Sequence, residues 1–289
     1  MDRKEVLIIG GDARQFYMAK HLLLHGYSVT VFGEAFSEGI DECRILETKE
    51  EVFFCMDAQR TLVVLPVPVT VDGQTVKGTG GEFMLEELCP HMKEKERIYG
   101  GNIPIELRGT CEMKQGQCMD FMKSERVAYL NAVSTAEGGI AEAIALGEGQ
   151  LSGSHCLVIG FGRCGAVLAD KLKCLGARVD VIERSGRKRA RATAYGLCSR
   201  SQEEDENHFG DYDYIFNTVP AQVVSRKILE ACKRDVAIID IASAPGGVDY
   251  EAAGALGIAA KLCLGLPGKY APKTAGEILA EEIMKTETN

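Results

Sequence analysis

The sequence contains no apolar run of the roughly 18 residues that a membrane-spanning helix requires. Its first apolar stretch is too short for a signal peptide and leads directly into a glycine turn. A basic excess is also missing, because the formal net charge is −9, and this acidic balance disfavours nucleic acid as a partner. We therefore expect a cytoplasmic protein with neither a membrane nor a nucleic-acid partner.

Cysteine and histidine patterns typical of metal sites are missing as well. The 11 cysteines include no C-x-x-C pair, and several lie in apolar runs, where cysteine packs as a small hydrophobic residue. His21 and His25 are four residues apart in an expected helix, but no third ligand accompanies them. The sequence therefore predicts neither a metal site nor a disulfide framework.

The stretch from Ser154 to Ser185 has the pattern of a strand, a glycine-rich turn, a helix and a second strand. In dinucleotide-binding turns of the form G-x-G-x-x-G, the first glycine permits a tight turn and the second admits the pyrophosphate. The third lets helix and strand pack closely. The helix N-terminus then presents free N–H groups to phosphate. This stretch predicts a bound dinucleotide; the alternative is a domain that kept the turn without the ligand. Its three glycines are Gly160, Gly162 and Gly165.

The residues after the second strand bear on which dinucleotide is bound. Glu183 lies near the position of the acid that binds the ribose 2′-hydroxyl in NAD enzymes. The residues that follow are Arg184, Ser185, Arg187, Lys188 and Arg189, and a guanidinium with a hydroxyl and a further cation suits a 2′-phosphate. We expect NADP as the cofactor, with NAD as the alternative. The predicted cofactor-binding residues are Gly160, Gly162, Arg163, Cys164, Gly165, Arg184, Ser185, Lys188, Thr218, Val219 and Pro220.

A second strand–turn–helix–strand unit occupies residues 4–32. Its turn has adjacent glycines followed by Asp12, a carboxylate that can satisfy the helix N–H groups itself. We expect the same type of fold here without a dinucleotide. The candidates to line a different site are Asp12, Arg14 and Gln15; the alternative is a helix cap with solvated charges.

Strand and helix patterns alternate along most of the chain, which predicts parallel sheets with helices on both faces. Loops that follow strand carboxyl ends bind ligands in such sheets, so residues 218–220 and 242–245 should face the cofactor. We expect an α/β protein with two doubly wound parallel-sheet (Rossmann-like) domains and a cleft between them. The N-terminal domain spans residues 1–130, and the C-terminal helix at 270–289 packs back on it. Residues 131–269 form the dinucleotide-binding domain with the linking helix.

Residues 123–147 predict a long helix that is either continuous or broken near residues 131–135. Ser134 and Glu137 have the spacing of a capping box. A helix beginning there would place Ser134 and Thr135 at an N-terminus suited to an anion such as a carboxylate. The alternative is that they act only as a cap.

Four segments together resemble the A subunit of bacterial dipicolinate synthase, and the resemblance covers nearly the whole chain. It implies a two-domain oxidoreductase that forms pyridine-2,6-dicarboxylate from dihydrodipicolinate or its hydrated precursor. It also implies a partner, a flavoprotein-like B subunit, and the mother cell of a sporulating bacterium as location. The segments are GGDARQ (10–15), NAVSTAEGGIAEAI (131–144), VIGFGRCG (158–165) and GLPGKYAPKTAGEIL (265–279).

The implied substrate carries two carboxylates, so its site requires cations or helix N-termini together with a proton acceptor. No histidine lies in a motif recognisable for that role. We expect the substrate to bind in the cleft between the two domains. We also expect the chain to form a homo-oligomer. The alternatives are a dehydrogenase of another small carboxylate and a cofactor-binding scaffold for a catalytic partner. The catalytic candidates are Lys269, Tyr270 and Lys273, and the substrate-binding candidates are Arg14, Ser134 and Thr135.

Overall fold

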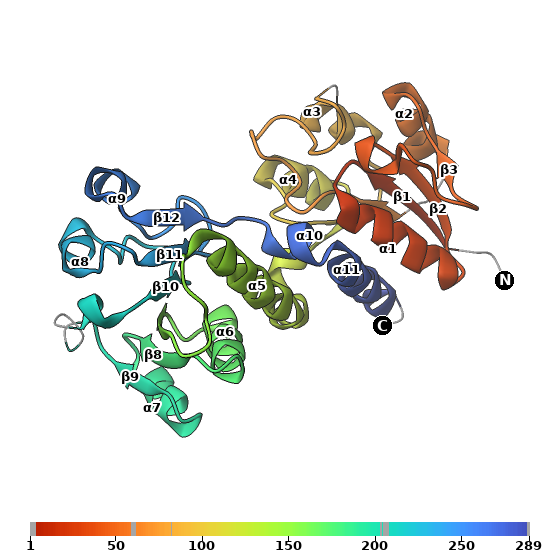
Figure 1. The fold of residues 1–289 in the computed structure, drawn as a ribbon. Coiled ribbons are helices and arrows are strands. Elements are labelled where there is room, and N and C mark those ends of the chain that lie inside the picture. Colours follow the sequence, from red (N-terminus) through yellow and green to blue (C-terminus); the bar gives the residue numbers. More distant parts are fainter. Residues whose placement is uncertain (1–3, 59–61, 82, 203, 205–207, 288–289) are drawn as a thin grey trace. The chain divides into compact units, whose positions relative to one another are not determined.

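A computed structural model describes residues 4–58, 62–81, 83–202, 204 and 208–287 of the 289-residue chain (Figure 1). The chain divides into two compact units, which are described separately. The first unit comprises Met1–Ala128 together with Ala271–Asn289, and the second comprises Tyr129–Tyr270. The sequence places the first boundary at residues 130/131, and the structure places it two residues earlier, inside a helix.

The first unit contains a six-stranded parallel sheet in the order β3-β2-β1-β4-β5-β6. The order reverses between β1 and β4, as in a doubly wound fold. Its strands are β1 (Glu5–Ile9), β2 (Ser28–Phe32), β3 (Arg44–Ile45), β4 (Leu62–Val64), β5 (Arg97–Gly100) and β6 (Gln117–Asp120). Its helices are α1 (Ala13–Leu24), α2 (Lys49–Ala58), α3 (Leu85–Leu88), α4 (Ile105–Met113) and α11 (Pro272–Thr286), with short 3-10 turns η1 (Glu34–Phe36), η2 (Cys89–His91) and η3 (Phe121–Lys123).

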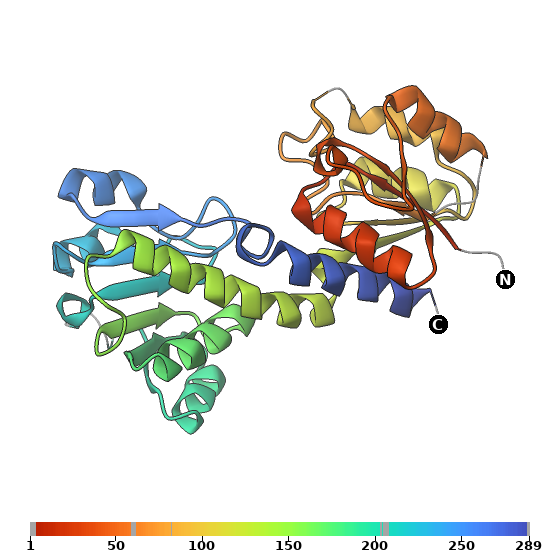
Figure 2. The ribbon, with the colours of Figure 1, turned by 45° about the vertical axis from the view of Figure 1, so that its right-hand side comes forward.

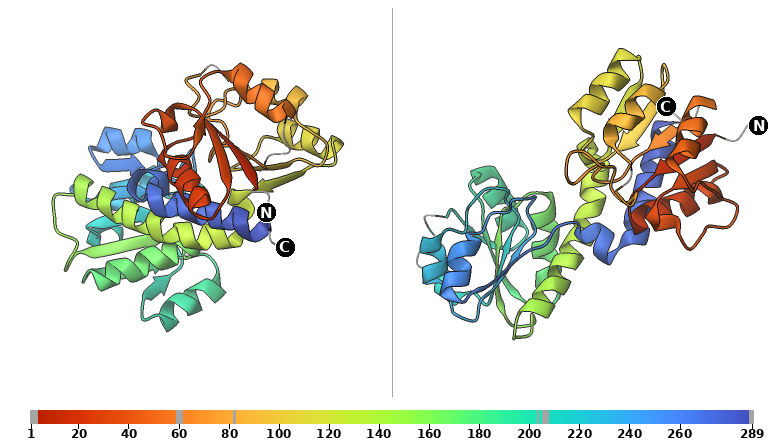
Figure 3. Two further views of the ribbon diagram at one scale, coloured as in Figure 1. Left: turned by 90° about the vertical axis from the view of Figure 1, so that its right-hand side faces the viewer. Right: turned by 90° about the horizontal axis from the view of Figure 1, so that it is seen from above.

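Strand β1 shows why this unit is covered on both faces. Its apolar residues are all buried, because successive side chains point to opposite faces of a sheet that has helices on each side. Val6 and Ile8 pack in one cluster with α1 and α11, and Leu7 and Ile9 pack in another with α2, α3 and α4. Helices α1 and α11 lie side by side, although α11 ends the chain (Figures 2 and 3).

The second unit repeats this plan with the order β12-β11-β10-β7-β8-β9, again all parallel. Helices α5, α6 and α7 contribute to the core on one face of the sheet, and α8 and α9 to the core on the other. The strands are β7 (His155–Ile159), β8 (Arg178–Ile182), β9 (Cys198–Arg200), β10 (Tyr214–Asn217), β11 (Ala237–Asp240) and β12 (Ala259–Leu262). The helices are α5 (Glu125–Leu146), α6 (Arg163–Cys174), α7 (Gly186–Ala194), α8 (Arg226–Ala231), α9 (Tyr250–Leu256) and α10 (Leu266–Tyr270), with the 3-10 turn η4 (Phe209–Asp211).

The two sheets confirm the predicted α/β fold with two doubly wound parallel-sheet units. Within the part of the chain that the structure describes, no helix is long and apolar enough to cross a bilayer.

A helix break near residues 131–135 is wrong, because α5 runs without interruption from Glu125 to Leu146. Ser134 is buried within it, and the Thr135 hydroxyl donates a hydrogen bond of 2.8 Å to the carbonyl of Asn131 one turn earlier. One side of this helix is buried, and the residues on that side include Ala132, Ala136 and Ala143. Tertiary packing therefore outweighs the local capping preference of serine and threonine.

Candidate functional site

The turn between β7 and α6 is built from glycines, two of which no other residue could replace without movement. A Cβ at Gly160, whose φ is +93°, would lie 2.4 Å from Oγ1 of Thr218, and one at Gly165 would lie 2.0 Å from the carbonyl oxygen of Gly160. At Gly162 a Cβ would meet nothing within 4 Å among the described residues. Gly162 is also the N-cap of α6, and no described side chain caps this helix. An anion that approaches over Gly162 would therefore meet the N-terminus of α6.

The corresponding turn after β1 is filled by the protein itself. The Asp12 carboxylate accepts a hydrogen bond of 3.1 Å from the Arg14 N–H, and Gln15 Oε1 accepts one of 2.9 Å from the Asp12 N–H. The Gly11 N–H donates to the carbonyl of Lys77 at 2.7 Å. Burial alone would raise the pKa of Asp12, but hydrogen bonds and charge from Arg14 and Lys77 hold it well below its usual range.

A pocket of about 670 Å³ opens at the carboxyl ends of β7, β8 and β10 in the second unit. This is the point where the strand order reverses, and there doubly wound sheets bind ligands. One end of the pocket is polar and follows β8; the other is largely apolar and follows β10. Of the predicted cofactor residues, those that line it are Gly160, Gly162, Arg184, Lys188, Thr218, Val219 and Pro220; Arg163, Cys164 and Gly165 lie in the first turn of α6, and Ser185 is the N-cap of α7.

The carboxylate of Glu183 joins the glycine turn to the segment after β8. It is buried, and its two oxygens accept hydrogen bonds from the N–H groups of Phe161 at 2.9 Å and Ser185 at 3.0 Å. Lys188 Nζ lies 3.5 Å from Oε2. Burial acts to raise the pKa of Glu183, but the two backbone N–H groups and Lys188 lower it on balance. The Glu183 side chain is therefore a charged acceptor whose two oxygens already accept hydrogen bonds from backbone N–H groups.

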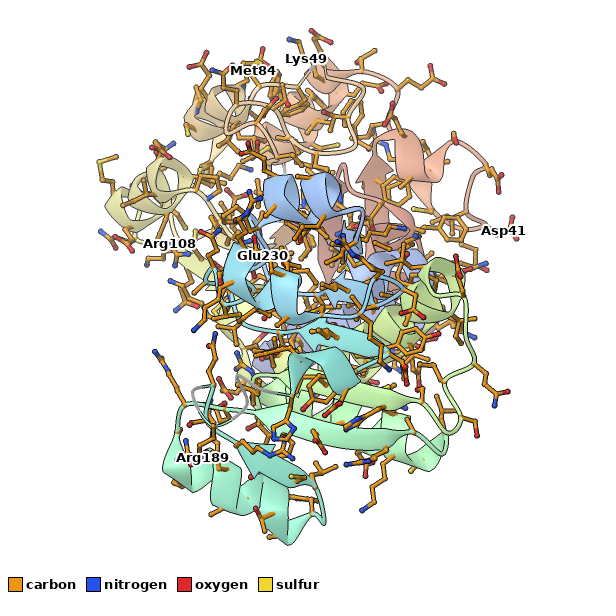
Figure 4. The ribbon with its side chains drawn as sticks, turned by 60° about the vertical axis from the view of Figure 1, so that its left-hand side comes forward. Asp41, Lys49, Met84, Arg108, Arg189 and Glu230 are labelled. Carbon is orange, nitrogen blue, oxygen red and sulfur yellow. The ribbon has the colours of Figure 1, made fainter. Side chains whose placement is uncertain are left out.

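Arg189, on α7 (Figure 4), holds the chain from which Arg184 and Ser185 project. Its Nη1 donates to the carbonyl oxygens of Glu183 and Arg184, both at 2.9 Å. The sequence presents it as one of several cations that follow β8. The structure instead commits its guanidinium to the backbone, which leaves Arg184 and Lys188 as the basic side chains lining the pocket.

A second polar cluster forms around the buried Glu142 of α5. Lys269 Nζ and the Tyr270 hydroxyl donate to Oε1 at 2.5 and 2.9 Å, and Lys261 Nζ donates to Oε2 at 2.6 Å. Hydrogen bonds from the two lysines lower the pKa of Glu142 to about 2. The same bonds raise the pKa of Lys269 and of Lys261. Both lysines are therefore cations at neutral pH.

Sequence reasoning selected Lys269 and Tyr270 but missed Glu142 and Lys261. The available signal was a carboxylate in an otherwise apolar helical stretch, IAEAIA at 140–145. Such a group must find hydrogen-bond donors when it is buried. The donors lie more than 100 residues away along the chain, so their identity depends on the fold.

The remaining predicted residues are divided between the units. Arg14, in the first unit, is buried and donates to both oxygens of Asp12 and to the carbonyl of Val67. Lys273 is exposed in the first turn of α11. Ser134 and Thr135 lie within α5 in the second unit. Burial raises the pKa of the Cys164 thiol, and a hydrogen bond with Thr135 opposes this rise, so Thr135 lies beside the glycine turn.

Two family models match the chain in succession. The N-terminal domain of the dipicolinate synthase A subunit matches residues 5–122, and the NAD binding domain of D-isomer specific 2-hydroxyacid dehydrogenase matches residues 122–252. The dipicolinate synthase A subunit of Bacillus subtilis (strain 168) is 31% identical over 97% of this chain and 95% of its own length.

Two solved structures match this chain over nearly its whole length. The crystal structure of the dipicolinate synthase A subunit from Bacillus halodurans matches with a TM-score of 0.89 and 30% identity, covering 99% of this chain and 98% of that one. The corresponding crystal structure from Bacillus subtilis matches with a TM-score of 0.86 and 29% identity, covering 100% and 97%. The second unit is thus a nicotinamide-dinucleotide-binding domain of the dehydrogenase type, and the chain belongs to the family of dipicolinate synthase A subunits.

Proposed function

We propose that this chain is the NADP-binding subunit of an oxidoreductase that forms dipicolinate (pyridine-2,6-dicarboxylate) from dihydrodipicolinate or its hydrated precursor. The observation that carries the proposal is the uncapped N-terminus of α6 over the open Gly162, beside Arg184 and Lys188, in a chain of this family. Dihydrodipicolinate loses a hydride and a proton to give the aromatic ring, and the hydrated precursor also loses water. A bound nicotinamide would supply the hydride acceptor.

The chain's own residues suit the different parts of this cofactor. Gly162 and the N–H groups of Arg163, Cys164 and Gly165 in the first turn of α6 would hold the pyrophosphate. Arg184, Ser185 and Lys188 would hold a 2′-phosphate. Thr218, Val219 and Pro220 would wall the nicotinamide end. Glu183 favours this assignment over NAD, because both of its oxygens already accept backbone N–H groups.

Cofactor preference can be tested by removing the basic side chains one at a time. We expect Arg184→Ala and Lys188→Ala each to raise the Kd for NADP about tenfold, because a charge-assisted hydrogen bond contributes about 1.5–3 kcal/mol. The Kd for NAD should stay within about twofold. Arg178→Ala, at the opposite end of β8, is the control and should change neither value. Tighter binding of NAD by the wild type, or equal losses for both cofactors, would contradict the preference for NADP.

For the substrate, we assign Lys269 to one carboxylate, since it is protonated and its side chain is 55% exposed. Tyr270 and Lys273 remain the candidates for moving the proton. Arg14, Ser134 and Thr135 remain proposed substrate ligands, with Ser134 and Thr135 acting through their hydroxyls, because α5 has no N-terminus at these residues. Lys269→Ala should lower kcat/KM at least tenfold, because it removes one charge-assisted pair. The Kd for NADP should stay within about twofold. Lys285→Ala, in the last turn of α11, is the control with unchanged kcat/KM.

The decisive measurement is turnover by the purified chain given NADP and freshly generated dihydrodipicolinate, with NADPH and dipicolinate followed separately. We expect both products in equal amounts. The resemblance also implies a partner, a flavoprotein-like B subunit, and the mother cell of a sporulating bacterium as location. We also propose that the chain forms a homo-oligomer, which light scattering can measure. Turnover only with another small carboxylate would replace the substrate. NADP binding without any turnover, even with the B subunit, would leave a cofactor-binding scaffold.

A further inference from the structure

Asn217 and Asp240 end the neighbouring parallel strands β10 and β11 and lie directly opposite each other in register. Both are fully buried. The Asn217 side-chain amide donates a hydrogen bond of 2.9 Å to Oδ1 of Asp240. The two strand ends are thus joined by side chains as well as by the sheet, next to the pocket that follows β10.

The Asp240 carboxylate is held by four donors that carry no formal charge. Oδ1 accepts from Asn217 and from the Ala242 N–H at 3.1 Å; Oδ2 accepts from the Gly247 N–H at 2.6 Å and the Tyr250 hydroxyl at 2.8 Å. A buried carboxylate is costly unless its oxygens are satisfied in this way. The 242–247 loop therefore folds around Asp240, and a Cβ at Gly246 would lie 2.5 Å from Oδ2.

Asn217 connects this carboxylate to the wall of the pocket. Its Oδ1 accepts from the Val219 N–H, and its Nδ2 donates to the Val219 carbonyl, both at 3.0 Å. Gly247 packs directly on the same group, because a Cβ there would lie 2.4 Å from Nδ2 of Asn217 and 2.7 Å from the Val219 carbonyl oxygen. The backbone N–H and the backbone carbonyl of Val219 are therefore both fixed by residues that lie behind the pocket wall.

The order of the strands says which half of a cofactor meets this wall. In the sheet, β7 lies between β8 and β10, so the glycine turn after β7 separates the two ends of the pocket. The basic side chains Arg184 and Lys188 follow β8, where a phosphorylated adenosine would lie. A dinucleotide whose pyrophosphate rests on the glycine turn then extends its other half toward Val219 and Pro220.

We propose that Asn217, Asp240 and Tyr250 are positioning residues that shape the nicotinamide half of the cofactor site; this rests on the proposed function. Asp240 acts through Asn217 on the Val219 peptide, and Tyr250 acts through Asp240. Changes in this network should weaken ligands that possess a nicotinamide group and spare ligands that lack one.

The test compares NADP with 2′-phospho-ADP-ribose, which has the same phosphates and adenosine but no nicotinamide, by calorimetry on the full chain. Asp240→Asn sets an amide in place of an acceptor oxygen, and Tyr250→Phe removes one donor. We expect Asp240→Asn to raise the Kd for NADP about tenfold and Tyr250→Phe to raise it about threefold, because hydrogen bonds to charged groups are strong. The Kd for 2′-phospho-ADP-ribose should stay within about twofold in both.

Tyr214→Phe is the matched control, since it removes a buried hydroxyl that donates to the Gly149 carbonyl at the other end of β10. It should leave both Kd values unchanged. Equal losses for the two ligands, or an unchanged Kd for NADP in Tyr250→Phe, would overturn the inference even if Asp240→Asn fails to fold. If the wild type binds neither ligand, the proposed function itself is wrong and this inference falls with it.

Discussion

Gly160 and Gly162 are two residues apart in one turn, yet a methyl group would act differently at each. At Gly160 it would collide with Thr218 across the sheet, and the positive φ would be strained as well. At Gly162 it would project into open space at the N-terminus of α6, where φ is −81°. A substitution at Gly162 therefore tests ligand binding without disturbing the folding of the domain, whereas a substitution at Gly160 disturbs both.

Gly162→Ala should therefore fold normally and lose the cofactor. We expect the Kd for NADP and for NAD to rise more than about tenfold, because the methyl group occupies the approach to the α6 N–H groups. The thermal unfolding midpoint should change by no more than about 3 °C. Calorimetry and a thermal melt on the same sample check both statements.

Gly254→Ala, on the exposed part of α9, is the matched control, because a Cβ there would meet no described atom within 4 Å. It should keep both affinities and raise stability by up to about 1 kcal/mol. Unchanged cofactor binding by Gly162→Ala would move the pyrophosphate away from this turn.

At the scale of elements, α1 and α6 occupy the same place after the first strand of their sheets but begin differently. Asp12 and Gln15 form a capping box on α1, whereas α6 begins at an uncapped glycine. This contrast could be predicted from the sequence, because a cap residue acts on N–H groups two or three positions away. The continuity of α5 could not, since it depends on the surface against which Ala132, Ala136 and Ala143 pack.

The pair α1–α11 depends on one glycine. A Cβ at Gly276 would lie 2.3 Å from the Arg14 carbonyl oxygen and 3.0 Å from the Met18 nitrogen. Both contacts are backbone and cannot rotate away. Gly276→Ala should therefore push the helices apart and lower the free energy of unfolding of the first unit by roughly 1–3 kcal/mol.

Unfolding in denaturant, monitored through hydrogen exchange of the β1 and β2 amides, measures this loss of stability. Gly109→Ala in α4 of the same unit is the matched control, because a Cβ there would lie more than 4 Å from every described neighbour. It should stabilise the unit slightly, as an alanine does in a helix. Equal stability of the Gly276→Ala and Gly109→Ala variants would contradict the close contact.

At the scale of the whole molecule, each unit has its own sheet and its own pair of apolar cores. The described residues that line the dinucleotide pocket belong to the second unit. NADP at about 100 times its Kd should therefore slow hydrogen exchange in β7, β8 and β10. The free energy of opening measured there should rise by up to about 2.7 kcal/mol. Exchange in β1, β2 and β4 should change much less. Equal protection in both units would show that they open together.

Features that act between near neighbours in the chain were determined by the sequence. The glycine spacing at 160–165, the cap at Asp12 and the alternation of apolar strands with helices predicted two doubly wound sheets and one dinucleotide turn. These depend on backbone sterics and local hydrogen bonds, which the sequence specifies directly.

The tertiary structure decided which charged groups meet. Lys261 and Lys269 converge on Glu142 from more than 100 residues away, and the Gly247 N–H reaches Asp240 only because the 242–247 loop folds back over the end of its strand. Arg189 is turned toward the backbone and not toward the pocket. A buried charge accepts whatever donors the packed elements bring to it, and packing depends on the whole fold.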